Sequence, residues 1–423
     1  MKSKNVSLKL IILNFLEFAV WGAYLTSLGR YLGRIGLGSE IKWFFTMQGI
    51  VSIFMPALLG ILADRKIQAQ KVLSMAQGIA GISMIAAGIY CMNAGAAVQF
   101  GPLFLLYSIS VAFFMPTIAL VNSVAYSALE GVGMDPVKDY PGIRVFGTIG
   151  FICSMLATNF VKFDGVAMQD SYTQLLSSGI LSVIMCFYAL TMPACPTKSA
   201  GESQSLVDSL GLKAFALFKD KQFAIFFIFS MLLGASLQIT NGYANTFLGS
   251  FASDPSLADT FAVKNSNAIL AISQASETLC ILLIPFFMKR YGIKKVMLIA
   301  MFAWVFRFGF FGLGQPDMPG VILFILSCIV YGVAFDFFNI SGSLYVNENT
   351  DNDIRSSAQG LFMLMTNGLG AAIGTLAAGA VVDACVYNAA TPDWSKAWYI
   401  FAAYSLVVAV LFMLLFKDPQ KKK

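Results

Sequence analysis

Carboxylate side chains stand inside three of the most apolar stretches of this sequence. They are Glu17 in "LNFLEFAVWG", Glu277 in "ISQASET" and Asp336 in "VAFDFFNISG". On insertion scales a charged residue at the centre of a bilayer costs about 2.5–3.5 kcal/mol, so an acid there points to a function. The chain contains no histidine, so a buried proton relay would have to use carboxylates, which burial can keep protonated near neutral pH. We therefore predict that Asp336, Glu277 and Glu17 are candidate proton carriers.

Polar and aromatic residues recur near these acids at the spacing of one helical face. Positions three, four or seven apart lie on the same side of a helix. The sets with this spacing are Arg144, Thr148 and Phe151; Gln238, Asn241 and Asn245; Gln274 and Glu277; and Tyr331, Phe335, Asp336 and Asn339. We interpret these stripes as the lining of a polar cavity inside a bundle of helices.

Structural roles are the alternative for several of these residues. Glu17 could lie near the membrane interface or pair with an arginine, and Arg144 could anchor a helix end. The amides between 238 and 245 could join neighbouring helices by hydrogen bonds. Arg307, in "WVFRFGF", has no polar stripe beside it, so we expect it to pair with an acid or to reach a surface.

The predicted lining favours a neutral solute. Amide side chains donate and accept hydrogen bonds, so they suit a ligand whose edges carry both kinds of group. Aromatic side chains pack against a planar ring or a sugar. Nucleosides and sugars both meet this description, whereas phosphorylated solutes would call for more cations.

The composition is that of an integral membrane protein. Of the 423 residues, 58% are hydrophobic and 12% are charged, and the mean hydropathy is +0.75; soluble proteins carry about 25% charged residues. Apolar windows of roughly 20 residues are typical of transmembrane helices. Twelve such windows lie near 9–29, 43–63, 73–95, 99–127, 143–161, 175–194, 222–250, 266–288, 293–314, 319–346, 356–382 and 395–416. We predict an all-α membrane protein with twelve transmembrane helices.

Charge and cysteine usage exclude several classes. Most Lys and Arg residues fall in loops that share one side if both termini are cytoplasmic, which is the positive-inside pattern. The net charge of +6 therefore reflects topology, and we expect no nucleic-acid partner. The seven Cys residues show no paired spacing, so we expect no metal site and no disulfide framework. No ATP-binding motif is visible, and we expect no cofactor.

A polar segment divides the predicted helices into two sets of six. Residues 195–221 contain Pro, Ser, Gly and several Lys, and we take 1–194 and 222–423 as the two halves. The halves correspond weakly, since "MPALLGILADRK" and "IPFFMKRYGIKK" each place a Pro before a basic turn. Two six-helix halves around a midplane site are typical of the major facilitator superfamily.

The turn "GILADRK" resembles a loop signature of that superfamily. Gly60, Asp64 and Arg65 match the signature, and Lys66 and Ile67 depart from it. The resemblance implies a cytoplasmic gate in which charges at helix ends hold one conformation. The alternative is an ordinary basic loop that obeys the topology rule.

Several longer stretches resemble the nucleoside:proton symporter family within the superfamily. They include "IRVFGTIGF", "AIFFIFSMLLGASLQITN", "ISQASETL" and "YGVAFDFFNISGS", and the similarity runs from the first helix to the last. The resemblance implies nucleoside uptake driven by protons, with Glu277 and Asp336 tied to coupling. The nucleoside-binding residues that it implies are Arg144, Thr148, Phe151, Gln238, Asn241, Gln274, Glu277, Tyr331 and Phe335. Glu17 departs from the family, where we expect an amide.

We therefore predict a proton-coupled nucleoside importer of the bacterial inner membrane. Its partners would be nucleosides, protons and the lipid bilayer, and one chain would suffice for function. An enzyme is not expected, because no nucleophile–base pair or metal cluster is visible. A sugar or oligosaccharide permease of the same fold is the main alternative, and a membrane sensor that binds a nucleoside without moving it is a second.

Overall fold

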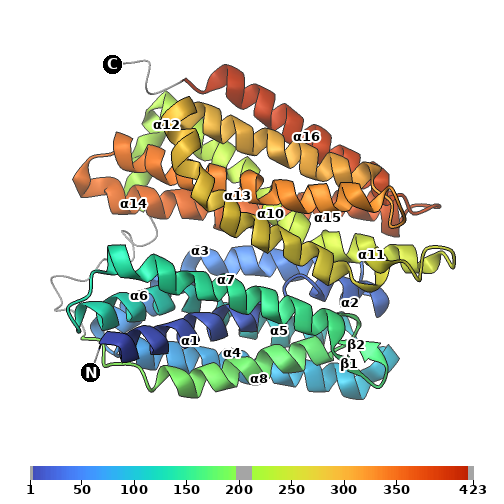
Figure 1. Cartoon of the computed structure of the whole chain (residues 1–423), viewed down its shortest axis with the longest axis horizontal. Helices are drawn as coiled ribbons and strands as arrows, with labels where there is room; N and C mark the ends of the chain where they lie inside the picture. The colour runs from blue at the N-terminus through green and yellow to red at the C-terminus, as the bar shows by residue number, and fades with distance from the viewer. Residues whose placement is uncertain (1–2, 197–211, 418–423) are drawn as a thin grey trace. The chain divides into compact units, whose positions relative to one another are not determined.

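The computed structural model of the chain is almost entirely helical, and it describes residues 3–196 and 212–417 (Figure 1). Within these ranges ten helices are long and apolar enough to cross a membrane, and Thr173–Ala189 forms a shorter apolar helix. The described strands are β1 (Lys162–Phe163) and β2 (Val166–Ala167), which pair antiparallel in one small hairpin. The predicted all-α membrane class is confirmed at this level.

The chain folds as two compact units. The first comprises Met1–Leu37 and Ile50–Leu206, and the second comprises Gly38–Gly49 and Val207–Lys423. The start of helix α3 (Ile41–Arg65) is therefore grouped with the second unit, which no sequence pattern had indicated. Of the predicted boundary segment 195–221, residues 197–211 lie outside the described part of the chain.

The first unit is a bundle in which α1 lies along α7, and α4 lies between α5 and α8. Its chain breaks near Pro116, which has no amide hydrogen to continue a helix, so one apolar window becomes the two helices α5 and α6. Its other described elements are short 3-10 turns and the β1–β2 hairpin. The helices are α1 (Ser3–Gly22), α2 (Leu28–Arg34), the rest of α3, α4 (Ala69–Ala94), α5 (Phe100–Phe114), α6 (Thr117–Glu130), α7 (Pro136–Phe160) and α8 (Thr173–Ala189).

The second unit is organised around the long element α12 and its neighbour α13. Asp220 begins the unit's first long helix by accepting hydrogen bonds from the amides of Gln222 (2.8 Å) and Phe223 (3.0 Å), a standard N-cap. The helices are α10 (Lys221–Ser250), α11 (Phe261–Lys264), α12 (Ser266–Leu313), α13 (Val321–Asn349), α14 (Asn352–Met363), α15 (Ala371–Val382) and α16 (Trp394–Leu415), with the π-helices η5 (Leu364–Gly370) and η6 (Asp383–Tyr387).

Helix α12 holds two of the predicted transmembrane windows. Gly292 interrupts it with φ 75° and ψ 171°, a conformation that suits glycine because it has no Cβ. Beyond this bend the chain folds back, since Arg307 Nη1 lies 3.4 Å from Ser273 Oγ. The predicted windows 266–288 and 293–314 are thus two helices that meet at a single non-helical residue.

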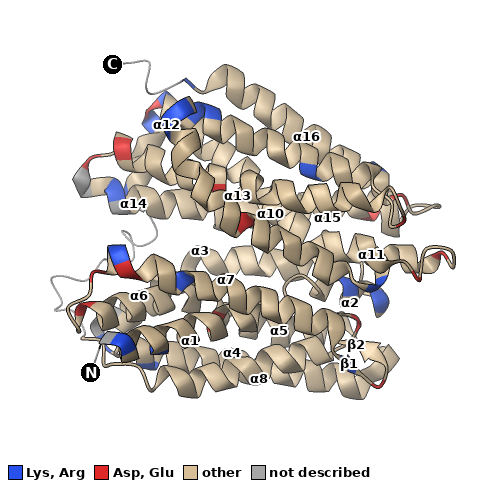
Figure 2. Cartoon of the chain, viewed as in Figure 1, with Lys and Arg blue, Asp and Glu red and all other residues tan. Residues whose placement is uncertain are grey.

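Charged residues gather at helix ends and in loops, while the helix bodies are largely uncharged (Figure 2). The first unit carries an ionic cluster in which the Arg30 and Asp170 side chains are largely buried and the Arg34 side chain is exposed. Asp170 lies 2.7 Å from Arg30 and 2.8 Å from Arg34, and the three residues join α2 to the 3-10 turn Met168–Asp170. This distribution is that of a membrane protein whose ionic contacts lie at the water-facing ends of its helices.

Candidate functional site

In the first unit, Glu17 is fully buried and hydrogen-bonded on both carboxyl oxygens. Gln77 Nε2 donates to Oε2 at 2.7 Å, and Thr117 Oγ1 lies 2.6 Å from Oε1. Ser182 extends the cluster by donating to the Gln77 side chain at 2.5 Å. The cluster joins α1, α4, α6 and α8, so Glu17 lies well inside the bundle and does not extend to an interface.

The predicted ligands of helix α7 contact aromatic residues of α1. The guanidinium carbon of Arg144 lies 3.9 Å from the centre of the Phe18 ring, a cation–π contact. The buried ring of Phe151 meets Trp21 edge-on, with centroids 6.0 Å apart. Thr148 is half-buried on the same helix.

Sequence reasoning had not singled out Phe18 or Trp21. Their spacing of three, directly after Glu17, was the available signal. The indole nitrogen of Trp21 is buried and has no hydrogen-bond partner among the described residues, so this aromatic cluster offers a hydrogen-bond donor to a ligand or to water.

In the second unit, a close helix crossing brings the two predicted acids together. Gly332 of α13 faces α12 so closely that an added Cβ would lie 2.6 Å from the Ser276 backbone and 2.8 Å from the Glu277 amide nitrogen. Asp336 follows one turn later, is buried, and interacts electrostatically with Glu277. The Oδ2 atom of Asp336 has no hydrogen-bond partner among the described residues.

The aromatic residues of the same stripe lie next to the acids. Tyr331 and Phe335 stack with ring centroids 6.0 Å apart and planes 7° apart. Tyr331 is buried, lies within hydrogen-bonding reach of Gln274, and interacts electrostatically with Glu277 and Asp336. The structure therefore brings together five residues that the sequence had placed on two separate stripes.

The amides of α10 divide into two kinds. Gln238 is buried, and its Oε1 has no hydrogen-bond partner among the described residues, while Asn241 is half-buried. Asn245 instead accepts a hydrogen bond from Ser266 Oγ at 2.6 Å and donates to Asn267 Oδ1 at 3.4 Å. Asn245 thus joins α10 to the start of α12, which is the structural role expected as the alternative for these amides.

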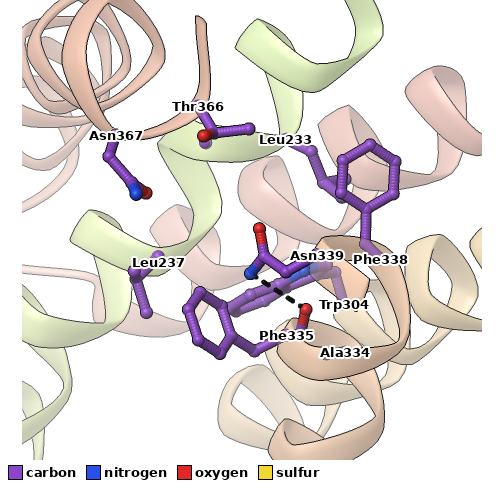
Figure 3. Close-up of a pocket in the computed structure, with 10 residues that line it drawn as sticks. Leu233, Leu237, Trp304, Ala334, Phe335, Phe338, Asn339, Thr366 and Asn367 are labelled. Carbon is purple, nitrogen blue, oxygen red and sulfur yellow. Dashed lines mark hydrogen bonds between the residues drawn. The ribbon is translucent and has the colours of Figure 1, made fainter. Parts of the chain in front are cut away.

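A small pocket lies within the second unit (Figure 3). Phe335 is the predicted binding residue that lines it. Its polar lining includes Asn339, whose Nδ2 donates to the Phe335 carbonyl at 3.2 Å, and Asn367. The remaining lining residues are Leu233, Gly234, Leu237, Trp304, Ala334, Phe338 and Thr366.

Sequence reasoning missed Thr366 and Asn367 because they lie in the π-helix η5, which has no recognised sequence pattern. A π-helical turn inside an α-helix is rare and is frequently found at functional sites. Here it closely approaches α10, where an added Cβ on Gly234 would lie 2.1 Å from the Thr366 carbonyl oxygen.

Arg307 contradicts its sequence-based expectation. It is 1% exposed, so it reaches no surface. Among the described residues it forms no ion pair, and it donates instead to the Ser327 carbonyl at 2.7 Å and to Thr240 Oγ1 at 3.3 Å. Neutral oxygens and aromatic rings therefore surround this guanidinium.

The predicted gate is described in part. Helix α3 ends at Arg65, and a Cβ added at Gly60 would have no neighbour within 4 Å. The side chains of Asp64 and Arg65 lie outside the described part of the chain. Within the described ranges no group of three or more His, Cys, Asp or Glu residues could hold a metal ion.

Known proteins are similar to this chain over nearly their full length. The family described as Nucleoside H+ symporter matches residues 4–421. Nucleoside permease NupG of Escherichia coli (strain K12) is 46% identical over 417 residues, covering 98% of this chain and 96% of that protein. The xanthosine permease of the same organism is 43% identical over 424 residues, covering 99% of this chain and 98% of that protein.

A solved structure extends this similarity to the fold. The crystal structure of nucleoside transporter NupG superposes with a TM-score of 0.89 at 46% identity, covering 98% of this chain and 99% of that one. The predicted family is confirmed by both comparisons. This chain belongs to the nucleoside H+ symporter family.

Proposed function

We propose that this protein is a proton-coupled nucleoside importer that works by alternating access across the bacterial inner membrane. The observation that carries the proposal is the stacked pair Tyr331 and Phe335 beside the acids Glu277 and Asp336, in a chain of the nucleoside H+ symporter family. The relatives it matches are named for nucleoside and xanthosine transport, which favours nucleosides over sugars.

The substrate would be held by aromatic faces and amides. In the second unit the stacked rings would flank the planar base. The Oε1 atom of Gln238, which has no partner among the described residues, would accept a hydrogen bond from the polar edge of the base. The amides of Asn241 and Gln274 would bind the same edge. The family resemblance also implies nucleoside-binding roles for Arg144, Thr148 and Phe151 of the first unit. Base–aromatic stacking is worth about 1–3 kcal/mol per base in other proteins, so the rings are the main source of affinity.

Proton coupling would take place at Glu277 and Asp336. Two carboxylates in close electrostatic contact in a poorly solvated site do not both ionise easily, so one of them holds a proton. Binding a proton from outside and releasing it inside would couple substrate movement to the membrane potential, which supplies about 2.3 kcal/mol per 100 mV. Glu17 is a third candidate, in the first unit.

The topology follows the charge pattern. The ten spans become twelve when α12 is counted as two helices that meet at Gly292 and Thr173–Ala189 is included. Both termini would then be cytoplasmic, and the turn with Gly60, Asp64 and Arg65 would be a cytoplasmic gate. One chain would form the complete transport path.

Transport by the purified protein tests the proposal. In proteoliposomes with an imposed inward proton gradient, labelled uridine or adenosine should accumulate, and a protonophore should abolish accumulation. Excess unlabelled nucleoside should compete, whereas ribose and lactose should not. Accumulation that survives the protonophore would exclude proton coupling, and competition by the sugars would favour the sugar permease.

A further inference from the structure

The buried guanidinium of Arg307 lies behind the aromatic pair that the proposed function assigns to the substrate. It contacts three segments: Thr240 of α10, Ser273 in the first part of α12 at 3.4 Å, and the Ser327 carbonyl of α13. Ser327 Oγ in turn donates to the Arg307 carbonyl at 2.8 Å. The side chain is therefore fixed in place and is not a mobile surface charge.

Arg307 also holds the ring of Tyr331 from one face. Its guanidinium carbon lies 4.5 Å from the centre of that ring and 5.2 Å from the centre of Phe311. Trp304 meets the Tyr331 ring at 90° with centroids 5.9 Å apart. The ring of Phe335 stacks on the ring of Tyr331. A cation–π contact is strongest where water is excluded, as it is here.

An unpaired charge in this position is unfavourable for stability alone. Arginine stays protonated in proteins, and burying its charge without a carboxylate is costly, whereas an apolar side chain of similar length would pack at lower cost. The other groups that face it are Tyr331 and Cys328 of α13. Tyr331 also interacts electrostatically with Glu277 and Asp336.

We propose that Arg307 is a positioning residue for substrate binding: it fixes the orientation of Tyr331, and through Tyr331 that of the stacked Phe335. This inference rests on the proposed function, because it takes these two rings as the surface that receives the nucleoside. Arg307 itself does not touch the substrate. Removing it should let the ring pair tilt, which weakens binding more than it slows transport of bound substrate.

The test separates binding from transport rate. Uridine uptake by proteoliposomes should show a KM raised roughly tenfold in Arg307→Met with Vmax changed less than twofold, in keeping with the loss of one desolvated cation–π contact. Arg307→Lys keeps the cation and should give an intermediate KM. The control Arg290→Met removes an exposed arginine of α12 that lies before the bend at Gly292, over Phe286 and Tyr291, and should leave KM unchanged.

A double-variant cycle distinguishes positioning from a general loss of packing. Because Arg307 acts through Tyr331, Arg307→Met should raise KM little further in a Tyr331→Leu background. The inference would be overturned if the KM changes of the two single variants multiplied in the double variant. An unchanged KM in folded Arg307→Met would overturn it as well. If Arg307→Met does not fold, Arg307→Lys is decisive, since a wild-type KM in that variant would overturn it as well. Wild-type protein that moves no nucleoside would instead refute the proposed function.

Discussion

Asp336 combines burial with an unsatisfied oxygen, and this sets it apart from the other acids. A buried carboxyl oxygen without a hydrogen-bond donor is unfavourable when it is ionised. Glu277 approaches from α12, so charging both groups adds repulsion. From these two features we propose that Asp336 is the residue at which a proton is taken up and released during transport.

Replacing Asp336 with asparagine should uncouple the protein. The Asp336→Asn variant keeps the shape of the side chain but cannot change charge, so we expect gradient-driven uridine accumulation to fall at least tenfold while exchange of uridine across the membrane continues. Proteoliposome uptake and counterflow measure the two activities. Asp254→Asn, at an exposed loop residue, serves as the control. If Asp336→Asn accumulated uridine to the wild-type level, Asp336 would have no role in proton coupling.

Glu17 differs because each of its oxygens already has a partner. Thr117 Oγ1 lies 2.6 Å from both Glu17 Oε1 and the Phe114 carbonyl oxygen. A hydroxyl has one hydrogen, so one of these two contacts needs a second proton, and the Glu17 carboxyl is the group that can supply it. The contacts favour a neutral acid that keeps its proton as part of the bundle.

Two substitutions at Glu17 separate a structural proton from an exchanged one. Glu17→Gln offers a carbonyl and a donor, as a neutral acid does, so uptake should stay within about twofold of wild type. Glu17→Ala leaves the Gln77 donor that meets Glu17 Oε2 unsatisfied and should reduce the free energy of unfolding by about 1–3 kcal/mol. Thermal unfolding and uptake assays measure these effects. Loss of proton-driven accumulation in Glu17→Gln would instead identify Glu17 as a coupling residue.

Between elements, the crossing of α12 and α13 sets the separation of the two coupling acids. Ser276 donates a hydrogen bond to the Ile329 carbonyl, and Gly332 leaves no room for a side chain at the crossing point. Glu277 and Asp336 flank this point on the two helices. Their spacing is therefore a property of backbone contact and not of flexible side chains.

A methyl group at Gly332 should disturb coupling without touching either acid. In Gly332→Ala the helices must move apart, which should cost about 1–3 kcal/mol and lower proton-driven accumulation several-fold. The matched control is Gly309→Ala, because a Cβ at Gly309 meets nothing within 4 Å. Thermal unfolding and uptake of the two variants give the comparison. Equal behaviour of the two variants would show that the crossing does not control the acids.

The link between α2 and the turn Met168–Asp170 predicts a pH dependence of stability. Burial alone would raise the pKa of Asp170, but Arg30 and Arg34 outweigh burial and hold the pKa below its ordinary value of 3.8. The carboxylate therefore stabilises the fold fully above that value, and the contribution is lost as the pH falls through the lowered pKa.

Asp170→Asn should reduce the free energy of unfolding by about 3 kcal/mol near neutral pH. The difference from wild type should shrink as the pH falls below about 4, because wild-type Asp170 then becomes protonated as well. Thermal unfolding in detergent at several pH values measures it. The exposed pair Asp259 and Lys264 provides a control, since Asp259→Asn should have little effect. A difference independent of pH would contradict the assignment.

At the scale of the whole molecule, composition and apolar windows predicted the helical membrane class, and the motifs predicted the family. Individual side-chain partners were harder to predict. The stripe with Asn245 was correct as a helical face, but the rotation of α10 about its axis turns that residue toward Ser266. Arg307 finds carbonyl and hydroxyl partners from three segments, a contact set that depends on packing and has no local sequence signal.

The bend at Gly292 also bears on how the chain reaches the membrane during synthesis. The two apolar helices are joined by a single non-helical residue. There is therefore no loop long enough for the first helix to cross the membrane before the second helix leaves the ribosome. Lys289, Arg290, Lys294 and Lys295 flank the bend and oppose its passage through the bilayer. We therefore expect Ser266–Leu313 to enter the membrane as one helical hairpin. The bend at Gly292 would stay on the side of the membrane where the ribosome lies.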